Sequence, residues 1–294
     1  MPVTRDSIRT TPYKVGNVAF GVANAGVRPA PPAPVPGALP AAATEYRTEH
    51  TLYPTASSRV NHAVSAPMVG DARRTITGGL NAAGDTIFLK YFDDHITSIV
   101  LPTPAPAGVT FFVTDNLTGC RFYVDRITGG GNGLVVYHAN THDYSAGALA
   151  DCDAQTANAE TVLDQLHLSA ELDYLALGFT LNNIAACSKP RYYRAGGDAE
   201  RRKRLQGRTA GKLLGSPAGA AFVGGTTVVG FPSGNTWEFW YQTYGTVDYE
   251  RPDVGGFEAA TKFHWNYMRK RKKSGLDHIG AASDFKVIDC QRII

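Results

Sequence analysis

The segment from Val113 to Asp143 constrains the fold most, because it contains two strand-like runs joined by a glycine-rich turn. The first run, from Arg121 to Ile127, is rich in aromatic and β-branched residues. The second run, from Leu134 to Tyr137, follows the connection Thr128-Gly129-Gly130-Gly131-Asn132-Gly133, whose glycines can adopt the positive φ angles of a hairpin turn. We therefore expect two antiparallel, neighbouring strands.

A cysteine precedes the first of these strands and a histidine follows the second. In an antiparallel hairpin Cys120 and His138 lie at the same end, within side-chain reach. A thiol and a neighbouring imidazole are what nucleophilic catalysis by cysteine requires. Thr118 and Gly119, just before the cysteine, are expected to offer an oxyanion hole, since glycine lets backbone amides approach a substrate carbonyl. A cysteine that only packs beside a histidine that only ends a strand leaves the same pattern.

The sequence Thr114-Asp115-Asn116-Leu117-Thr118-Gly119-Cys120, followed by a valine-rich aromatic strand and a strand that ends in His138, resembles the bacterial glutamine-deamidase toxins. That family includes the catalytic domain of cytotoxic necrotizing factor and Burkholderia lethal factor. The resemblance covers about 30 residues, with Thr118 where the family has serine and a longer link from cysteine to histidine. It implies that Cys120 is the nucleophile, that His138 is the base and that Thr114 orients His138.

The resemblance also implies a β-sandwich flanked by helices. The composition, with 31 glycines, 17 prolines and 14 tyrosines, favours strands and turns. We therefore expect an α+β fold like that of the deamidase cysteine hydrolases, with a central antiparallel β-sandwich and peripheral helices. Because residues 27–44 are a proline- and alanine-rich stretch, residues 1–44 are predicted to be a flexible N-terminal arm, and residues 45–294 the catalytic domain.

Further elements follow from the residue patterns. A hairpin joined at Asp93-Asp94 is predicted from the two runs 86–92 and 95–101. Other strands are expected at 109–114, 221–223, 226–231, 236–244 and 285–290, and helices at 156–166, 198–214 and 257–273. Cys152, Cys187 and Cys290 are expected to be buried as small hydrophobic residues.

Asn140 and His142 have the same parity as His138, so in an extended strand all three point to one face. We expect Asn140 and His142 to bind substrate, and Asn140 is an alternative to Thr114 as the group that orients the imidazole. The spacing of His138 and His142 suggests a metal pair only on a helix, and a third ligand is not identifiable. The expectation is therefore no metal and no cofactor.

The net charge of +3 gives no basic excess of the kind that nucleic-acid binding requires. The chain has neither a signal-peptide pattern nor a run of about 18 apolar residues that could span a membrane. We expect a monomeric, cysteine-dependent protein glutamine deamidase, or a transglutaminase when an amine replaces water. It would be a bacterial toxin or secreted effector that reaches a target cell without a signal peptide and modifies a protein there. The alternatives are a cysteine protease or acyltransferase with the same dyad, or a non-enzymatic β-sandwich binding module.

Overall fold

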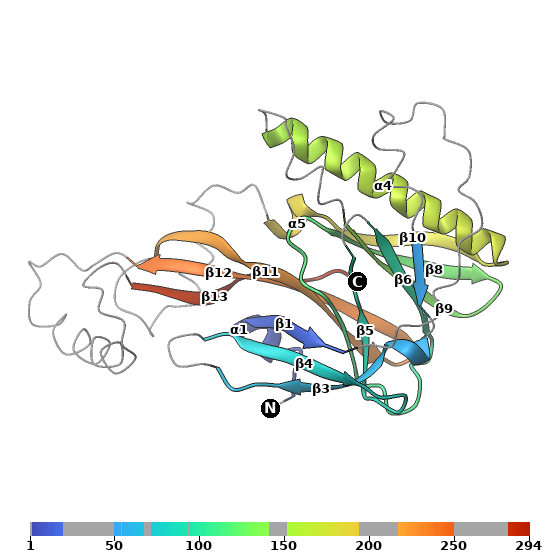
Figure 1. Cartoon of the computed structure of the whole chain (residues 1–294), viewed down its shortest axis with the longest axis horizontal. Coiled ribbons are helices and arrows are strands. Elements are labelled where there is room, and N and C mark those ends of the chain that lie inside the picture. The colour runs from blue at the N-terminus through green and yellow to red at the C-terminus, as the bar shows by residue number, and fades with distance from the viewer. Residues whose placement is uncertain are drawn as a thin grey trace, which may run out of the picture.

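The computed structural model describes residues 2–19, 50–53, 55–67, 72–92, 95–140, 152–193, 217–249 and 282–294. Two β-sheets pack against each other, and helix α4 (Cys152–Ala176) lies across the outer face of the smaller sheet (Figure 1). The protein therefore has a β-rich α+β fold. Among the described residues, no helix has both the length and the apolar character needed to cross a membrane.

The larger sheet has eight strands. They are β1 (Tyr13–Val18), β3 (Arg59–Val64), β4 (Arg74–Leu80), β5 (Thr86–Leu89), β7 (Phe111–Thr114), β11 (Pro217–Ser233), β12 (Thr236–Tyr249) and β13 (Ala282–Arg292). Their order in the sheet is β1-β4-β3-β5-β7-β11-β12-β13. The pairs β1–β4 and β5–β7 are parallel, whereas the other pairs are antiparallel.

The smaller sheet has five strands. They are β2 (His50–Tyr53), β6 (Ile96–Pro102), β8 (Arg121–Gly129), β9 (Gly133–Ala139) and β10 (Thr180–Cys187), in the order β10-β8-β9-β6-β2. β2 and β6 are parallel and the remaining pairs are antiparallel. Both sheets are thus mixed, whereas the sequence predicted a wholly antiparallel sandwich.

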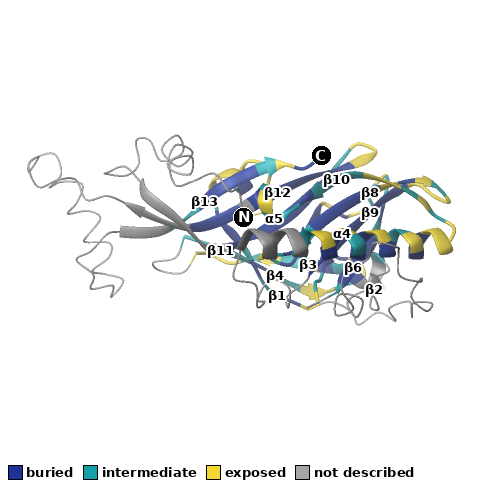
Figure 2. Cartoon of the chain, turned by 90° about the horizontal axis from the view of Figure 1, so that it is seen from above, coloured by how far each residue is buried: buried dark blue, intermediate teal, exposed yellow. Residues whose placement is uncertain are grey.

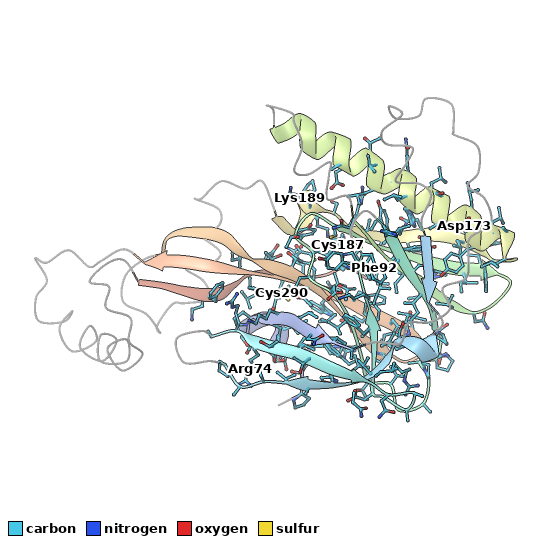
Figure 3. All side chains as sticks on the ribbon, in the orientation of Figure 1. Arg74, Phe92, Asp173, Cys187, Lys189 and Cys290 are labelled. Atoms are coloured by element: carbon cyan, nitrogen blue, oxygen red, sulfur yellow. The ribbon has the colours of Figure 1, made fainter. Side chains whose placement is uncertain are left out.

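The main core lies between the two sheets. Phe112 and Val228 of the larger sheet belong to the same buried cluster as Phe122 and Val136 of the smaller one. Side chains fill this space, which also contains Cys187 (Figure 3). Strand β9 is buried along its whole length because α4 covers its other face, which explains why its sequence is a continuous apolar run rather than an alternating one.

Helix α4 packs one apolar face on the smaller sheet, and its exposed positions point away from it (Figure 2). Leu163, Leu166 and Ala170 are fully buried and recur at the spacing of one helical face. Burial of each leucine stabilises the fold by about 1.5–3 kcal/mol. The predicted helix at 156–166 is confirmed, and it extends further at both ends. Two short helices, α1 (Ser7–Thr10) and α5 (Lys189–Tyr193), and the 3-10 turn η2 (Thr55–Ser58) complete the described elements.

The predicted hairpin of β8 and β9 is confirmed, with Arg121 opposite Ala139 and Phe122 opposite His138. The hairpin of β11 and β12 is confirmed as well, and so are the strands that became β7 and β13. The hairpin predicted from the runs 86–92 and 95–101 is wrong. Strands β5 and β6 belong to different sheets, because β5 pairs in parallel with β7 and the chain then crosses to the other layer. The helices predicted at 198–214 and 257–273 lie outside the described residues.

The N-terminal part of the predicted arm is integral to the fold. β1 pairs in parallel with β4, and Val3, Ile8 and Tyr13 are buried in a second cluster on the outer face of the larger sheet. The prediction of a flexible arm is therefore wrong for residues 2–19. The proline- and alanine-rich stretch itself lies outside the described residues.

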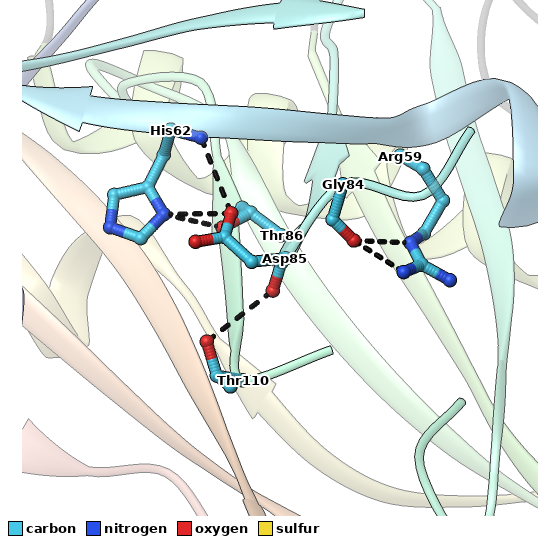
Figure 4. A network of polar contacts seen from close by, with 6 residues as sticks. All are labelled: Arg59, His62, Gly84, Asp85, Thr86 and Thr110. Carbon is cyan, nitrogen blue, oxygen red and sulfur yellow. Dashed lines mark hydrogen bonds and ion pairs between the residues drawn. The ribbon is translucent and has the colours of Figure 1, made fainter. Parts of the chain in front are cut away.

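A polar network joins β3 to the chain before β5 (Figure 4). The Nδ1 atom of His62 lies 3.2 Å from Asp85 Oδ1 and 2.7 Å from Thr86 Oγ1. On the same strand, Arg59 Nε donates to the carbonyl oxygen of Gly84 at 2.7 Å. These contacts tie β3 to the residues at the start of β5.

Candidate functional site

The thiol and the imidazole singled out by the sequence lie where β8 begins and β9 ends. Because Phe122 faces His138 across the ladder, Cys120 comes level with Asn140, and all four positions share one face of the smaller sheet. That face looks toward the larger sheet, since Phe122 belongs to the core between the sheets. The structure therefore brings Cys120, His138 and Asn140 together, as the hairpin predicted.

Across the interface, the parallel strands β5 and β7 end at the same edge, with Leu89 paired to Thr114. The residues that follow these strands, Lys90, Tyr91 and Asp115, complete the surroundings of the thiol and the imidazole. We call the eight residues of this region the cysteine site. It contains Lys90, Tyr91, Asp115, Thr118, Gly119, Cys120, His138 and Asn140.

The sulfur of Cys120 accepts a hydrogen bond from Asn140 Nδ2 at 2.9 Å. The side chain is only 1% exposed. Burial raises the pKa of the Cys120 thiol, and the contact with Asn140 and the nearby backbone of Thr118 and Gly119 lower it only in part. In the described state the thiol is neutral at pH 7, whereas an activated nucleophile has a lowered pKa.

His138 is fully buried, and its ring stacks on Tyr91 with 5.5 Å between the ring centroids. Neither ring nitrogen has a hydrogen-bond partner among the described residues. Burial, with a smaller effect from the positive charge of Lys90, lowers the pKa of His138 to about 3. The imidazole is therefore neutral at physiological pH and has a free lone pair that can accept a proton.

The thiol and the imidazole are neighbours without a direct hydrogen bond. Cys120 and His138 stand in diagonal positions across the ladder. The backbones of residues in such positions are about 7–8 Å apart. The sulfur is held by Asn140 instead. The hydrogen bond between the thiol and the imidazole that general-base activation needs is therefore not formed in this state, although Cys120 and His138 share one face of the sheet.

Thr114 does not contact the imidazole in the way that the family resemblance implied. Its buried hydroxyl donates to the carbonyl oxygen of Asp115 at 2.7 Å. Asp115 in turn receives the backbone N–H of Tyr91 at 3.2 Å and lies 3.3 Å from the Lys90 ammonium. Burial raises the pKa of Asp115, and Lys90 opposes that shift. Thr114 therefore helps to fix the Asp115 backbone rather than to orient His138.

The turn before Cys120 is anchored at three points. Leu117 exchanges two backbone hydrogen bonds with Thr226 of β11, at 2.6 and 3.0 Å. The side chain of Asn116 bonds both backbone groups of Val15 in β1, at 3.3 and 3.1 Å. From α5, the hydroxyl of Tyr192 donates to the Cys120 carbonyl oxygen at 2.9 Å. These contacts fix the backbone that carries the thiol.

Sequence patterns identified five of the eight residues of the cysteine site. Lys90, Tyr91 and Asp115 were missed, because their proximity depends on the parallel pairing of β5 and β7. His142 and the side chain of Cys152 lie outside the described residues. Cys187 and Cys290 are buried, as predicted.

A search of protein-family models and of curated protein sequences finds no match to this chain.

Proposed function

We propose that the protein is a cysteine-dependent amidohydrolase that deamidates protein glutamine, with Cys120 as the nucleophile and His138 as the base. The observation that carries the proposal is a thiol that accepts a hydrogen bond from Asn140 and shares one face of the sheet with a buried imidazole whose nitrogens have no partner among the described residues. A buried polar atom without a partner costs about 1–3 kcal/mol. A histidine maintained at that cost suggests a functional requirement.

In the proposed reaction, His138 takes the proton of Cys120 and the thiolate attacks the side-chain amide carbon of glutamine. The backbone N–H groups of Thr118 and Gly119, with Asn140, are the donors available to the developing oxyanion. Collapse of the tetrahedral intermediate breaks the carbon–nitrogen bond, and ammonia leaves with the proton from the imidazolium. Water then hydrolyses the thioester to glutamate and regenerates the thiol, whereas an amine at this step would give transglutamination.

Catalysis requires a change in the described state. The sulfur must leave the Asn140 amide and approach the imidazole, so a substrate that hydrogen-bonds Asn140 is the natural trigger. Both groups are neutral in the described state, and the pKa of His138, about 3, must rise when substrate binds for the imidazole to take the thiol proton. The role of a bacterial toxin or secreted effector, delivered without a signal peptide to a target cell, rests on the local resemblance of residues 114–120 and His138 to the deamidase toxins.

One observation favours a second candidate, a non-enzymatic β-sandwich binding module. The Cys120 side chain is almost fully buried and burial raises its pKa, which is typical of a packed structural cysteine. In that case the Asn140 contact only closes the end of the β8–β9 hairpin.

The test is a mass measurement on a glutamine-rich acceptor protein and on a protein extract of candidate target cells. Deamidation adds about one mass unit per glutamine, whereas a protease gives fragments. We expect the gain with the wild-type chain and a loss of at least about 100-fold in Cys120→Ser and His138→Phe, because removal of the nucleophile or base removes the reaction. Cys187→Ser, which changes another buried thiol of the same core, is the matched control and should remain active. Equal mass gain with Cys120→Ser, or none with the wild type on any acceptor, would exclude the proposal.

A further inference from the structure

A second cluster of chemically active side chains lies on the other face of β8, beneath α4. Asp125 points to this face, because it alternates with Val124 of the core between the sheets. His167 and Glu171 come from α4 and are one helical turn apart, so both lie above the same patch of sheet. Asp125 is fully buried, His167 is 6% exposed and Glu171 is half-buried.

The three side chains converge on one point. The ligand atoms of Asp125, His167 and Glu171 all lie within 4.8 Å of one another. His167 Nε2 is 3.1 and 3.0 Å from the two carboxylate oxygens of Asp125. A cation about 2.0–2.2 Å from a nitrogen and an oxygen separates these two ligand atoms by about 3.0–3.5 Å at ordinary bond angles. His167 and Asp125 thus already have the spacing of two ligands of one ion, and the Glu171 oxygen lies within 4.8 Å of both ligand atoms.

The imidazole is held in place from two sides. The ring of Tyr123 stacks on it at 4.0 Å with an interplanar angle of 7°, and Tyr137 meets it edge-on at 4.8 Å. Asn183 Nδ2 donates to Asp125 Oδ1 at 2.8 Å, which fixes the carboxylate, while Oδ2 lies 3.0 Å from His167 Nε2. Such outer contacts orient the ligands in metal sites.

A separate observation points to a missing ligand. The hydroxyl of Tyr137 is buried close to Asp125, and it forms no hydrogen bond of ordinary geometry among the described residues. Tyr137 lies opposite Tyr123 in the ladder, diagonal to Asp125 on the same face. A bound cation, or the water it carries, supplies the partner that this hydroxyl lacks.

We propose that Asp125, His167 and Glu171 bind one divalent first-row transition-metal ion, with Zn²⁺ the best fit. One imidazole and two carboxylates suit zinc, whereas Mg²⁺ and Ca²⁺ take oxygen ligands. Two carboxylate charges balance the ion with a neutral imidazole, and water would complete four-coordinate geometry. The ion would hold α4 against β8.

The sequence predicted no metal because Asp125 and the helix ligands are far apart in the chain. This site is on the opposite face of β8 from Cys120, so the metal proposal and its test do not depend on the deamidase proposal.

The test is a titration of the metal-free full-length chain with Zn²⁺, followed by calorimetry, and with Co²⁺, followed by visible absorption. We expect one equivalent per chain, a cobalt spectrum typical of four-coordinate geometry, and a higher unfolding temperature with Zn²⁺ but not with Mg²⁺. Glu171→Gln and His167→Gln should each weaken Zn²⁺ binding by at least about 10–100-fold, since each removes a ligand.

Glu160→Gln is the matched control, because Glu160 is also half-buried on α4 but contacts Arg121 outside the cluster. It should bind Zn²⁺ as the wild type does. Glu171 reaches the surface, so its variant is expected to fold even if that of His167 does not. Absence of stoichiometric Zn²⁺ binding to the wild type would overturn the proposal. Unchanged affinity in Glu171→Gln would do the same, because it would mean an adventitious ion only.

Discussion

His138 keeps an ionisable ring where water is excluded and where neither nitrogen has a described hydrogen-bond partner. Its stacking on Tyr91 needs only an aromatic ring, so packing alone does not require histidine at this position. His62 is a useful contrast, because its Nδ1 contacts Asp85 and Thr86 and its polar atoms contribute to the fold. The two histidines should therefore respond in opposite ways to loss of their nitrogens.

His138→Phe is expected to raise the free energy of unfolding at pH 7 by about 1–3 kcal/mol, since it removes two unpartnered polar atoms and keeps the stacking. The gain should grow on acidification. The pKa of His138 is lowered from 6.5 to about 3 in the folded state, so between these pH values only the unfolded chain binds the proton. Wild type should lose about 1.4 kcal/mol per pH unit relative to the variant.

Urea unfolding of both chains from pH 7.5 down to pH 4 is the measurement, with His62→Phe as the control that should lose stability. Parallel pH curves for wild type and His138→Phe would contradict the buried, neutral imidazole.

At the level of elements, the cysteine site depends on the turn between β7 and β8. The side chain of Asn116 in this turn forms hydrogen bonds with β1. The Oδ1 atom of Asn116 also accepts a hydrogen bond from the hydroxyl of Thr227 in β11 at 3.0 Å. Elements from the two ends of the chain therefore hold the backbone that carries Cys120.

Asn116→Ala should lower the free energy of unfolding by about 1–3 kcal/mol, because it leaves partly buried groups of Val15 and Thr227 without their partner. If the turn amides serve the reaction, deamidation should fall more steeply than stability does. Asn81→Ala is the control, since its side chain accepts only the nearby N–H of Ala83 at an exposed turn. Chemical unfolding and the mass assay on the same samples measure both effects. A variant as stable and active as the wild type would show that the turn keeps its conformation without the side-chain contacts of Asn116.

At the level of the whole molecule, the sequence predicted those parts of the fold that depend on residues close together in the chain. The hairpins of β8–β9 and β11–β12 could be predicted because alternating strands flank a short turn. Parallel pairings join distant segments and leave no local signal, so β1 was taken for part of an arm and β5 for half of a hairpin with β6. The β-rich α+β fold was predictable, but not the mixed sheets.

The same distinction explains the two sites. Cys120, His138 and Asn140 share one hairpin, so their common face followed from strand parity. Lys90 and Asp115 join them only through the parallel pair β5–β7. The cluster of Asp125, His167 and Glu171 needs α4 to be packed on β8, which no spacing in the sequence reveals.

The central claim is that Cys120 is a nucleophile served by His138, and a glutamine analogue tests it most directly. A peptide with a diazoketone in place of the glutamine amide loses N₂ and alkylates a thiol that attacks it. Peptide mapping by mass spectrometry should find one adduct per chain, on Cys120, in the wild type and in Cys187→Ser, and little in His138→Phe. An unlabelled Cys120, or labelling that does not depend on His138, would contradict the account.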